Sequence, residues 1–127
     1  MGLDQYGWAV AAEHVKQDVD FDLAEDVKAE KIAYWRKHSN LQGWMHKLYE
    51  KKGGKDTEFN CVPVVLTEAD LNELEVAVRK NLLPETRGFF FGASYRSDDE
   101  RDYDLEFIAK ARAAIAEGKT VYYSSWW

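Results

Sequence analysis

The stretch from Arg96 to Trp127, "RSDDERDYDLEFIAKARAAIAEGKTVYYSSWW", places an amphipathic helix directly before a strand. Acidic residues fill the first turns, where the helix dipole favours them, and Gly118 is suited to end a helix. Residues 120–127 then predict a strand rich in rings. We expect the helix to bury one side, which consists of Tyr103, Phe107, Ile108, Ala111 and Ile115.

The first half of the chain predicts a strand, a loop and a helix. Residues 5–11 are typical of a strand with Tyr6 and Trp8 on one face, and the acidic residues 13–30 predict a loop or a weak edge strand. Residues 31–52 predict a helix that the glycines of "KKGGK" end, or two helices that meet where Ser39 and Asn40 offer N-caps. The expected buried stripe of this helix is Leu41, Trp44, Met45 and Leu48.

The middle of the chain predicts two strands around another helix. Residues 59–66 read as a strand, in which Pro63 indicates an edge or a bulge. Thr67 is the expected N-cap of a helix that ends before Pro84 and buries Leu71, Leu74 and Val78. Residues 87–95, "RGFFFGASY", predict a further short strand.

Alternating strands and helices with short joints favour an α+β fold or a small α/β sandwich. We predict the α+β class, a single sheet of about four strands with about three helices packed against it. The 127 residues, of which 46% are hydrophobic, suit a single compact domain over residues 1–127.

Charge and cysteine content restrict the function. The formal net charge of -6 argues against nucleic acid polymers as partners, because such binding depends on lysines and arginines displacing counterions. Cys61 is the single cysteine, so the chain forms no internal disulfide, and a reducing host cytoplasm is the expected compartment. No stretch resembles a signal peptide or a membrane-spanning segment.

Common catalytic signatures are absent from the sequence. It contains no GxGxxG, GxxxxGK[ST], HExxH or GxSxG motif, and the histidines are not spaced as metal ligands on one helix. We therefore predict no cofactor and no metal site. Cys61 could act as a nucleophile only beside a histidine, and its apolar surroundings favour a plain core cysteine.

A mixture of rings and cations in residues 34–44 is the strongest binding signal. It is typical either of a solvated helix flank or of a site in which cations grip an anion while a ring covers a base or sugar. Arg87 adds a cation next to Gly88, and the terminal rings either dock on the fold or line a cleft. The candidate ligand-binding residues are Tyr34, Arg36, Lys37, His38, Asn40, Trp44, Arg87, Tyr123 and Trp126.

The chain resembles a family of small bacteriophage and prophage proteins of uncharacterised activity. The resemblance covers nearly the whole chain and rests on "MGLDQY", "YWRKHSNLQGWM", "LLPETRGFFFG" and "YYSSWW", in that order. Members have sometimes been labelled phosphoglycerate kinase, which does not fit so short a chain without a phosphate loop. The resemblance implies a phage setting and brings no activity. Gln42 stands where relatives often carry a histidine, which weakens any proposal of a base there.

Three functions remain open at this level. The first is a protein that binds a small anionic, nucleotide-like ligand, such as a signal of host defence. The second is an inhibitor that contacts a host protein through its acidic surface, and a homo-oligomer is compatible with either. The third is a small enzyme that acts on a nucleotide or sugar phosphate with Asp4, His38 or a tyrosine as acid or base. Binding without catalysis is the favoured reading.

Overall fold

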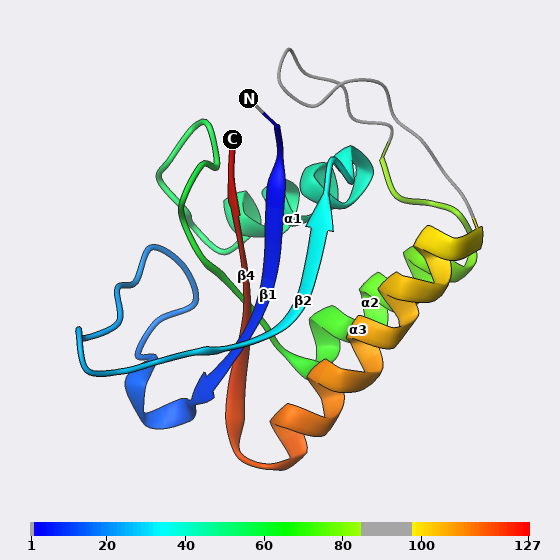
Figure 1. The fold of residues 1–127 in the computed structure, drawn as a ribbon. Helices are drawn as coiled ribbons and strands as arrows, with labels where there is room; N and C mark the ends of the chain where they lie inside the picture. The colour runs from blue at the N-terminus through cyan, green and yellow to red at the C-terminus, as the bar shows by residue number, and fades with distance from the viewer. Residues whose placement is uncertain (1, 85–97) are drawn as a thin grey trace.

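The computed structural model describes residues 2–84 and 98–127, which form a four-stranded antiparallel sheet and three α-helices (Figure 1). The strands, in the spatial order β2-β1-β4-β3, are β1 (Asp4–Ala11), β2 (Glu30–Arg36), β3 (Val64–Leu66) and β4 (Lys119–Trp126). The helices are α1 (Ser39–Lys51), α2 (Glu68–Arg79) and α3 (Asp98–Ala116), with a short 3-10 helix η1 (Ala12–His14) after β1. The predicted α+β class is thus confirmed.

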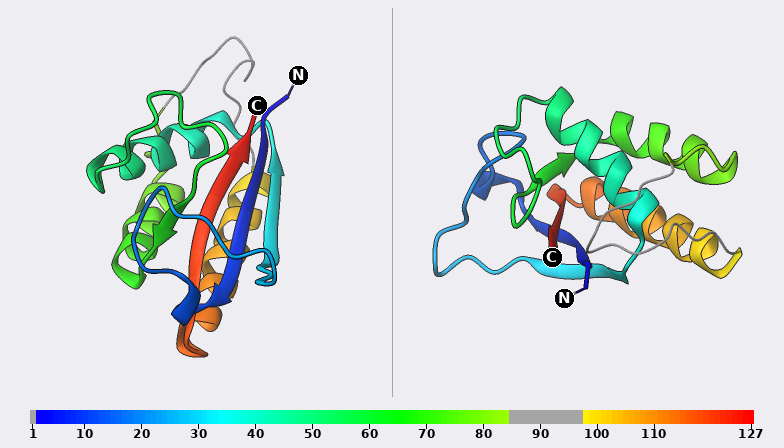
Figure 2. Two further views of the ribbon diagram at one scale, coloured as in Figure 1. Left: turned by 90° about the vertical axis from the view of Figure 1, so that its left-hand side faces the viewer. Right: turned by 90° about the horizontal axis from the view of Figure 1, so that it is seen from above.

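The sheet has an inner face against the helices and an outer face that carries no helix of the described chain (Figure 2). Successive residues of β1 alternate between the two faces, as the strand geometry requires. Gln5, Gly7 and Ala9 are buried on the inner face, whereas Tyr6 and Trp8 are half-buried on the outer face. β1 pairs with β2 on one side and with β4 on the other, so all three present the same two faces.

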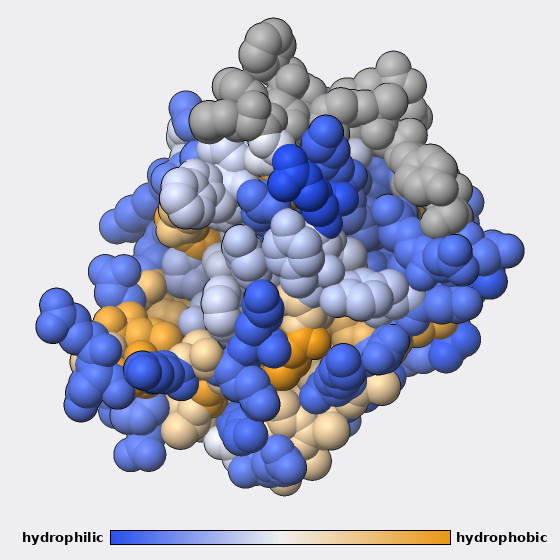
Figure 3. Space-filling model, viewed as in Figure 1, coloured by the Kyte–Doolittle hydropathy of each residue, from blue (hydrophilic) through white to orange (hydrophobic). Residues whose placement is uncertain are grey.

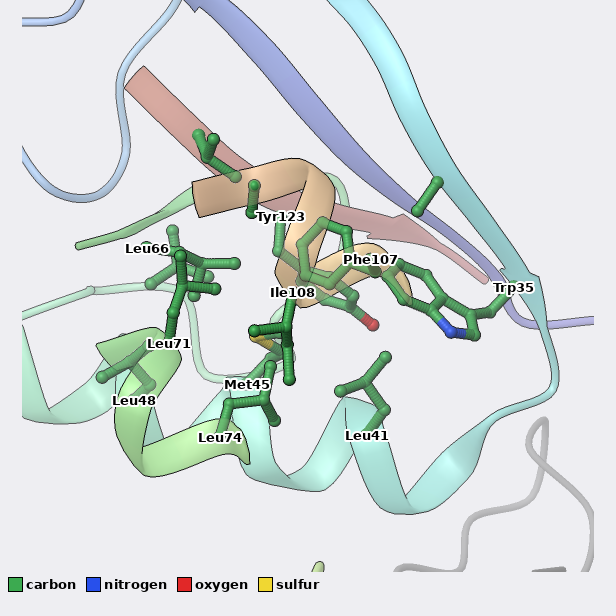
Figure 4. Packing of buried hydrophobic residues seen from close by; sticks show 14 of the residues in the cluster. Trp35, Leu41, Met45, Leu48, Leu66, Leu71, Leu74, Phe107, Ile108 and Tyr123 are labelled. Carbon is green, nitrogen blue, oxygen red and sulfur yellow. The ribbon is translucent and has the colours of Figure 1, made fainter. Parts of the chain in front are cut away.

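The main core fills the space between the inner face and the helices (Figure 4). Phe107 of α3 lies so close to β1 that a Cβ atom on Gly7 would be 2.4 Å from its ring, which explains why a glycine occupies the strand there. Of the predicted buried stripes, Trp44 and Ile115 are only half-buried and Tyr103 is 38% exposed. The others are buried as predicted: Leu41, Met45, Leu48, Leu71, Leu74, Val78, Phe107, Ile108 and Ala111.

The predicted helix over residues 31–52 is wrong in its first part. Residues 30–36 form β2, and α1 begins at Ser39 after His38, which is the N-cap in place of Ser39 or Asn40. Lys37 separates the two elements with a left-handed φ of 62°. Pairing with β1 provides β2 with a ladder of hydrogen bonds, and alternation then buries Ala33 and Trp35 while Tyr34 points outward. Residues 34–36 therefore lie on a strand and not on a helix flank.

Two other expectations are changed. The strand predicted over residues 59–66 is reduced to β3, which begins after Pro63 and lies at the edge of the sheet. Cys61 is an exposed residue with a φ of 62° and not a core cysteine. Residues 15–29 are mainly loop, as expected, with one isolated bridge from Val19 to β3. The strand predicted over residues 87–95 lies outside the described residues.

Asp70 connects the start of α2 to the end of α1, and its ionisation should make the stability of the fold depend on pH. It forms the capping box with Thr67 and an ion pair with Lys52. Burial alone would raise the pKa of Asp70, but the hydrogen bonds from Lys52 and Thr67 outweigh it and lower the pKa below its usual 3.8. Because the folded-state pKa is depressed, the stabilisation is present above the unfolded pKa and is lost as the pH falls through the folded pKa.

We expect Asp70→Asn to lower the free energy of unfolding by about 1–2 kcal/mol at neutral pH. The difference from the unmodified protein should shrink as the pH falls below the usual carboxyl range. Urea unfolding at several pH values measures this, with Asp102→Asn as an exposed control on α3. A difference that stays constant down to strongly acidic pH would contradict the assignment.

No helix in the described part of the chain is long and apolar enough to cross a bilayer.

Candidate functional site

Five of the nine candidate ligand-binding residues fall into two groups in the structure. Tyr34, Arg36 and Trp126 share the outer face of the sheet near the start of β1. Arg36 and Trp126 are paired with Asp4, and Tyr34 is paired with Tyr6. His38 and Asn40 lie at the start of α1 on the other side of the sheet, where both are buried. Arg36 and His38 are two positions apart in sequence but lie on opposite sides of the sheet.

The outer-face group is arranged around Asp4. In the register of the sheet, Asp4 lies between Arg36 of β2 and Trp126 of β4. The Tyr34 hydroxyl donates a 2.6 Å hydrogen bond to the Asp4 carboxylate, and the Arg36 guanidinium lies 3.5 Å from the same oxygen. The hydrogen bond to Asp4 raises the pKa of Tyr34 above its ordinary value. The tyrosine is thus held as a neutral donor.

A hollow of about 270 Å³ adjoins this group and is bounded by Gly2, Asp4, Trp126 and Trp127. The Arg36 guanidinium packs against Gly2, since a Cβ atom there would lie 2.6 Å from Nη2. The Trp126 side chain is 65% exposed, whereas Trp127 is tied down by Asn60, which accepts from its N–H and donates to its carbonyl. The backbone of Trp127 is therefore held in place, and the Trp126 ring is open to solvent, on the other side of Asp4 from Arg36.

Further rings extend the group along the outer face. Tyr6 lies 5.4 Å, between ring centroids, from both Tyr34 and Trp8, and the Lys31 ammonium lies 5.6 Å from the Tyr34 ring centroid. Within the described residues, Lys31 forms no ion pair, and its ammonium group lies over the Tyr6 and Tyr34 rings. We call Asp4, Tyr6, Lys31, Tyr34, Arg36 and Trp126 the aromatic face.

The opposite half of the outer face is covered. Val10, Val65 and Tyr122 are buried there beneath apolar residues of the 15–29 segment, among them Phe21 and Leu23. Figure 3 shows this side of the molecule, with hydrophobic residues at the lower left and residues of intermediate hydropathy gathered over the strands in the middle. The uncovered part of the sheet is therefore the part that carries the aromatic face.

His38 lies in a buried polar cluster on the inner side. Its Nε2 is 2.8 Å from Asp104 Oδ2, and the other oxygen of Asp104 accepts a 2.8 Å hydrogen bond from the indole N–H of Trp35. Since a carboxylate only accepts, Nε2 carries a proton. Nδ1 accepts a long hydrogen bond from the Leu41 N–H and lies 3.6 Å from Glu100. Burial raises the pKa of Glu100, the charge of His38 opposes that rise, and the charge of Asp104 adds to it.

Tyr123 is fully buried and hydrogen-bonds to Gln5, which in turn holds the backbone of His38. Its hydroxyl donates to Gln42 and accepts from Gln5 Nε2. Gln5 also donates to the His38 carbonyl and accepts from the His38 N–H, so it ties β1 to the start of α1. Burial raises the pKa of Tyr123 far above its ordinary value. Because Tyr123 is fully buried, it is not positioned to contact a ligand that binds from solvent.

The other candidates are dispersed. Lys37 is exposed between β2 and α1, Trp44 is half-buried on α1, and Arg87 lies outside the described residues. Sequence reasoning missed Lys31, Glu100, Asp104 and Gln5. Asp104 had one local signal, an acidic residue four positions before the buried Ile108, which places it on the buried side of the predicted helix.

In the described residues, no group of histidine, cysteine and acidic side chains is arranged to hold a metal ion. Comparison with known proteins gives no match to a family model, to a curated protein or to a solved structure.

Proposed function

We propose that the protein binds a small, ring-bearing anion of the nucleotide type on the aromatic face. The observation that supports this most is the arrangement of Tyr34, Arg36 and Trp126 around Asp4 on the outer sheet face. Asp4 and Trp126 also line the adjoining hollow. An exposed indole stacks on the face of a base, and a guanidinium binds phosphate by charge-assisted hydrogen bonds.

Exposure of the ion pair makes Arg36 available to such a ligand. The Arg36 side chain is 57% exposed and its nearest contact to Asp4 is 3.5 Å, so the pair is worth little in water. Phosphate can replace that contact, while Tyr34 continues to hold Asp4 and the adjacent Lys31 adds a second positive charge. Two cations at an otherwise acidic surface give the face a selective affinity for anions.

We expect adenosine 5′-monophosphate to quench the fluorescence of Trp126 and to bind with a measurable heat. Adenosine and inorganic phosphate, which each supply half of the interaction, should bind at least about tenfold more weakly, because stacking and charge-assisted hydrogen bonds each contribute roughly 1–3 kcal/mol. Trp126→Ala and Arg36→Gln should each weaken binding by a similar factor. Lys47→Gln, which removes an exposed charge from α1, is the control.

A panel of mononucleotides, cyclic nucleotides and dinucleotides widens the test to the host-defence signals that the phage-type motifs suggest. If no member gives heat or quenching, the proposal is wrong. Recovery of the nucleotide unchanged after incubation supports binding, whereas its conversion would support the alternative of a small enzyme. Stoichiometric capture of a host protein that the Trp126 and Arg36 variants also capture would favour the protein inhibitor.

A further inference from the structure

A second cavity, of about 260 Å³, lies on the inner side, away from the aromatic face. Its lining comes from the start of α1, the end of α2 and the start of α3, and includes His38, Arg79, Glu100, Arg101 and Asp104. The three helix ends are far apart in sequence and are brought together by the packing of the helices. The volume is just below the usual range for ligand pockets and suits a molecule of metabolite size.

One wall of this cavity presents hydrogen-bond acceptors. His38 and Asp104 have side chains only 3% exposed, and Asp104 already accepts from His38 Nε2 and from Trp35. Nδ1 is an acceptor, since it accepts from the Leu41 N–H, and this bond is long at 3.4 Å. Glu100 is adjacent, and a carboxylate has about four lone-pair directions, so it can accept from a ligand in addition to its other contacts.

Two arginines of the lining, Arg79 and Arg101, supply donors. Arg79 and Arg101 have side chains 61% and 48% exposed, and each is paired with an acidic residue of its own helix, Glu75 and Asp98. Such exposed pairs are weak and exchange readily with other partners. Arginine guanidinium groups bind carboxylate or phosphate in a forked geometry. The cavity is therefore lined with acceptors inside and with cationic donors at its exposed edge.

We propose that this cavity binds a small zwitterion, with its ammonium group at His38 and Glu100 and its carboxylate or phosphate at Arg79 and Arg101. His38 Nδ1 and the Glu100 carboxylate accept from the ammonium group, which would replace the long hydrogen bond from Leu41. Asp104 does not contact the ligand. It is a positioning residue, because its contact with Nε2 keeps the proton on that nitrogen and leaves Nδ1 to accept.

The test follows the imidazole nitrogens of His38 by nitrogen-15 NMR in the full chain. O-Phosphoethanolamine is a zwitterion with a phosphate group, and β-alanine is one with a carboxylate. Ethanolamine and inorganic phosphate are the separate halves of O-phosphoethanolamine. We expect a zwitterion to shift the His38 Nδ1 resonance at millimolar concentration, and each half to bind at least about tenfold more weakly. Comparison of the two zwitterions shows whether the cavity prefers phosphate or carboxylate.

Variants locate the binding. Glu100→Gln and Arg101→Gln should each weaken the binding of the zwitterion by at least about tenfold. Asp102→Asn, at an exposed position on the same helix, should leave the binding unchanged. Arg101 is exposed, so its variant tests the proposal even if Glu100→Gln does not fold. The proposal is overturned if no probe shifts Nδ1, if inorganic phosphate alone binds as well as O-phosphoethanolamine, or if Arg101→Gln binds like the unmodified protein.

Discussion

Asp104→Ala is expected to lower the free energy of unfolding by about 3–5 kcal/mol, which is typical when one partner of a buried polar pair is removed. The His38 Nε2–H and the Trp35 indole N–H both donate to the Asp104 carboxylate, and all three side chains are buried. Without it, two buried donors lose their acceptor, and each unpaired donor costs about 1–3 kcal/mol. The free energy of unfolding from urea denaturation measures the loss.

Two further variants separate the loss of hydrogen bonds from other effects. Asp104→Asn has nearly the same shape and keeps one carbonyl oxygen as an acceptor, so it should be clearly less destabilising than the alanine variant. Asp102→Ala, an exposed residue two positions earlier, should stay within about 0.5 kcal/mol of the unmodified protein. An alanine variant at position 104 as stable as the one at position 102 would show that this network does not stabilise the fold.

Phe107→Ala is expected to cost about 3–5 kcal/mol, because it removes a buried ring and leaves a cavity that rigid neighbours fill only in part. Phe107 is 1% exposed, and its ring meets the Trp35 ring edge-to-face at a centroid distance of 5.0 Å. Tyr103, one turn earlier on α3, also contacts Trp35 but is 38% exposed. Tyr103→Ala should therefore cost clearly less. Urea unfolding of both variants checks this difference.

Gly7 provides an independent test of the contact between α3 and β1. In the unmodified protein, Gly7→Ala should cost about 1–3 kcal/mol because the new methyl group overlaps the Phe107 ring. With Phe107→Ala already present, the same change should cost much less, so the two substitutions are coupled. Additive effects would mean that the ring does not pack on the glycine as the structure shows.

Where short-range signals are strong, the sequence was sufficient to predict the element. α2 begins after the Thr67 cap, with Asp70 completing the capping box, and the acidic first turn of α3 is equally clear. β1 and β4 follow their patterns of rings and β-branched residues closely. Capping and periodicity involve residues a few positions apart, so they are readable without knowledge of the fold.

The candidate site was predicted only in part. The sequence indicated rings and cations, and Tyr34, Arg36 and Trp126 do share one surface. The reason given for grouping Tyr34 and Arg36 was a helix, however, and they are instead two positions apart on β2, which places them on the same face. Tyr123 was read as an accessible ring, but strand alternation turns it inward, where its hydroxyl meets Gln42.

Composition and local pattern by themselves determined the acidic character of this chain, its α+β class and the position of most of its helices. Tertiary structure alone decided that residues 30–36 are a strand, because a strand gains its hydrogen bonds from distant partners, here β1. It likewise decided that His38 meets Asp104, 66 residues later, and that Arg36 of β2 and Trp126 of β4 lie on either side of Asp4. Such contacts depend on how the helices and strands pack, which no local pattern encodes.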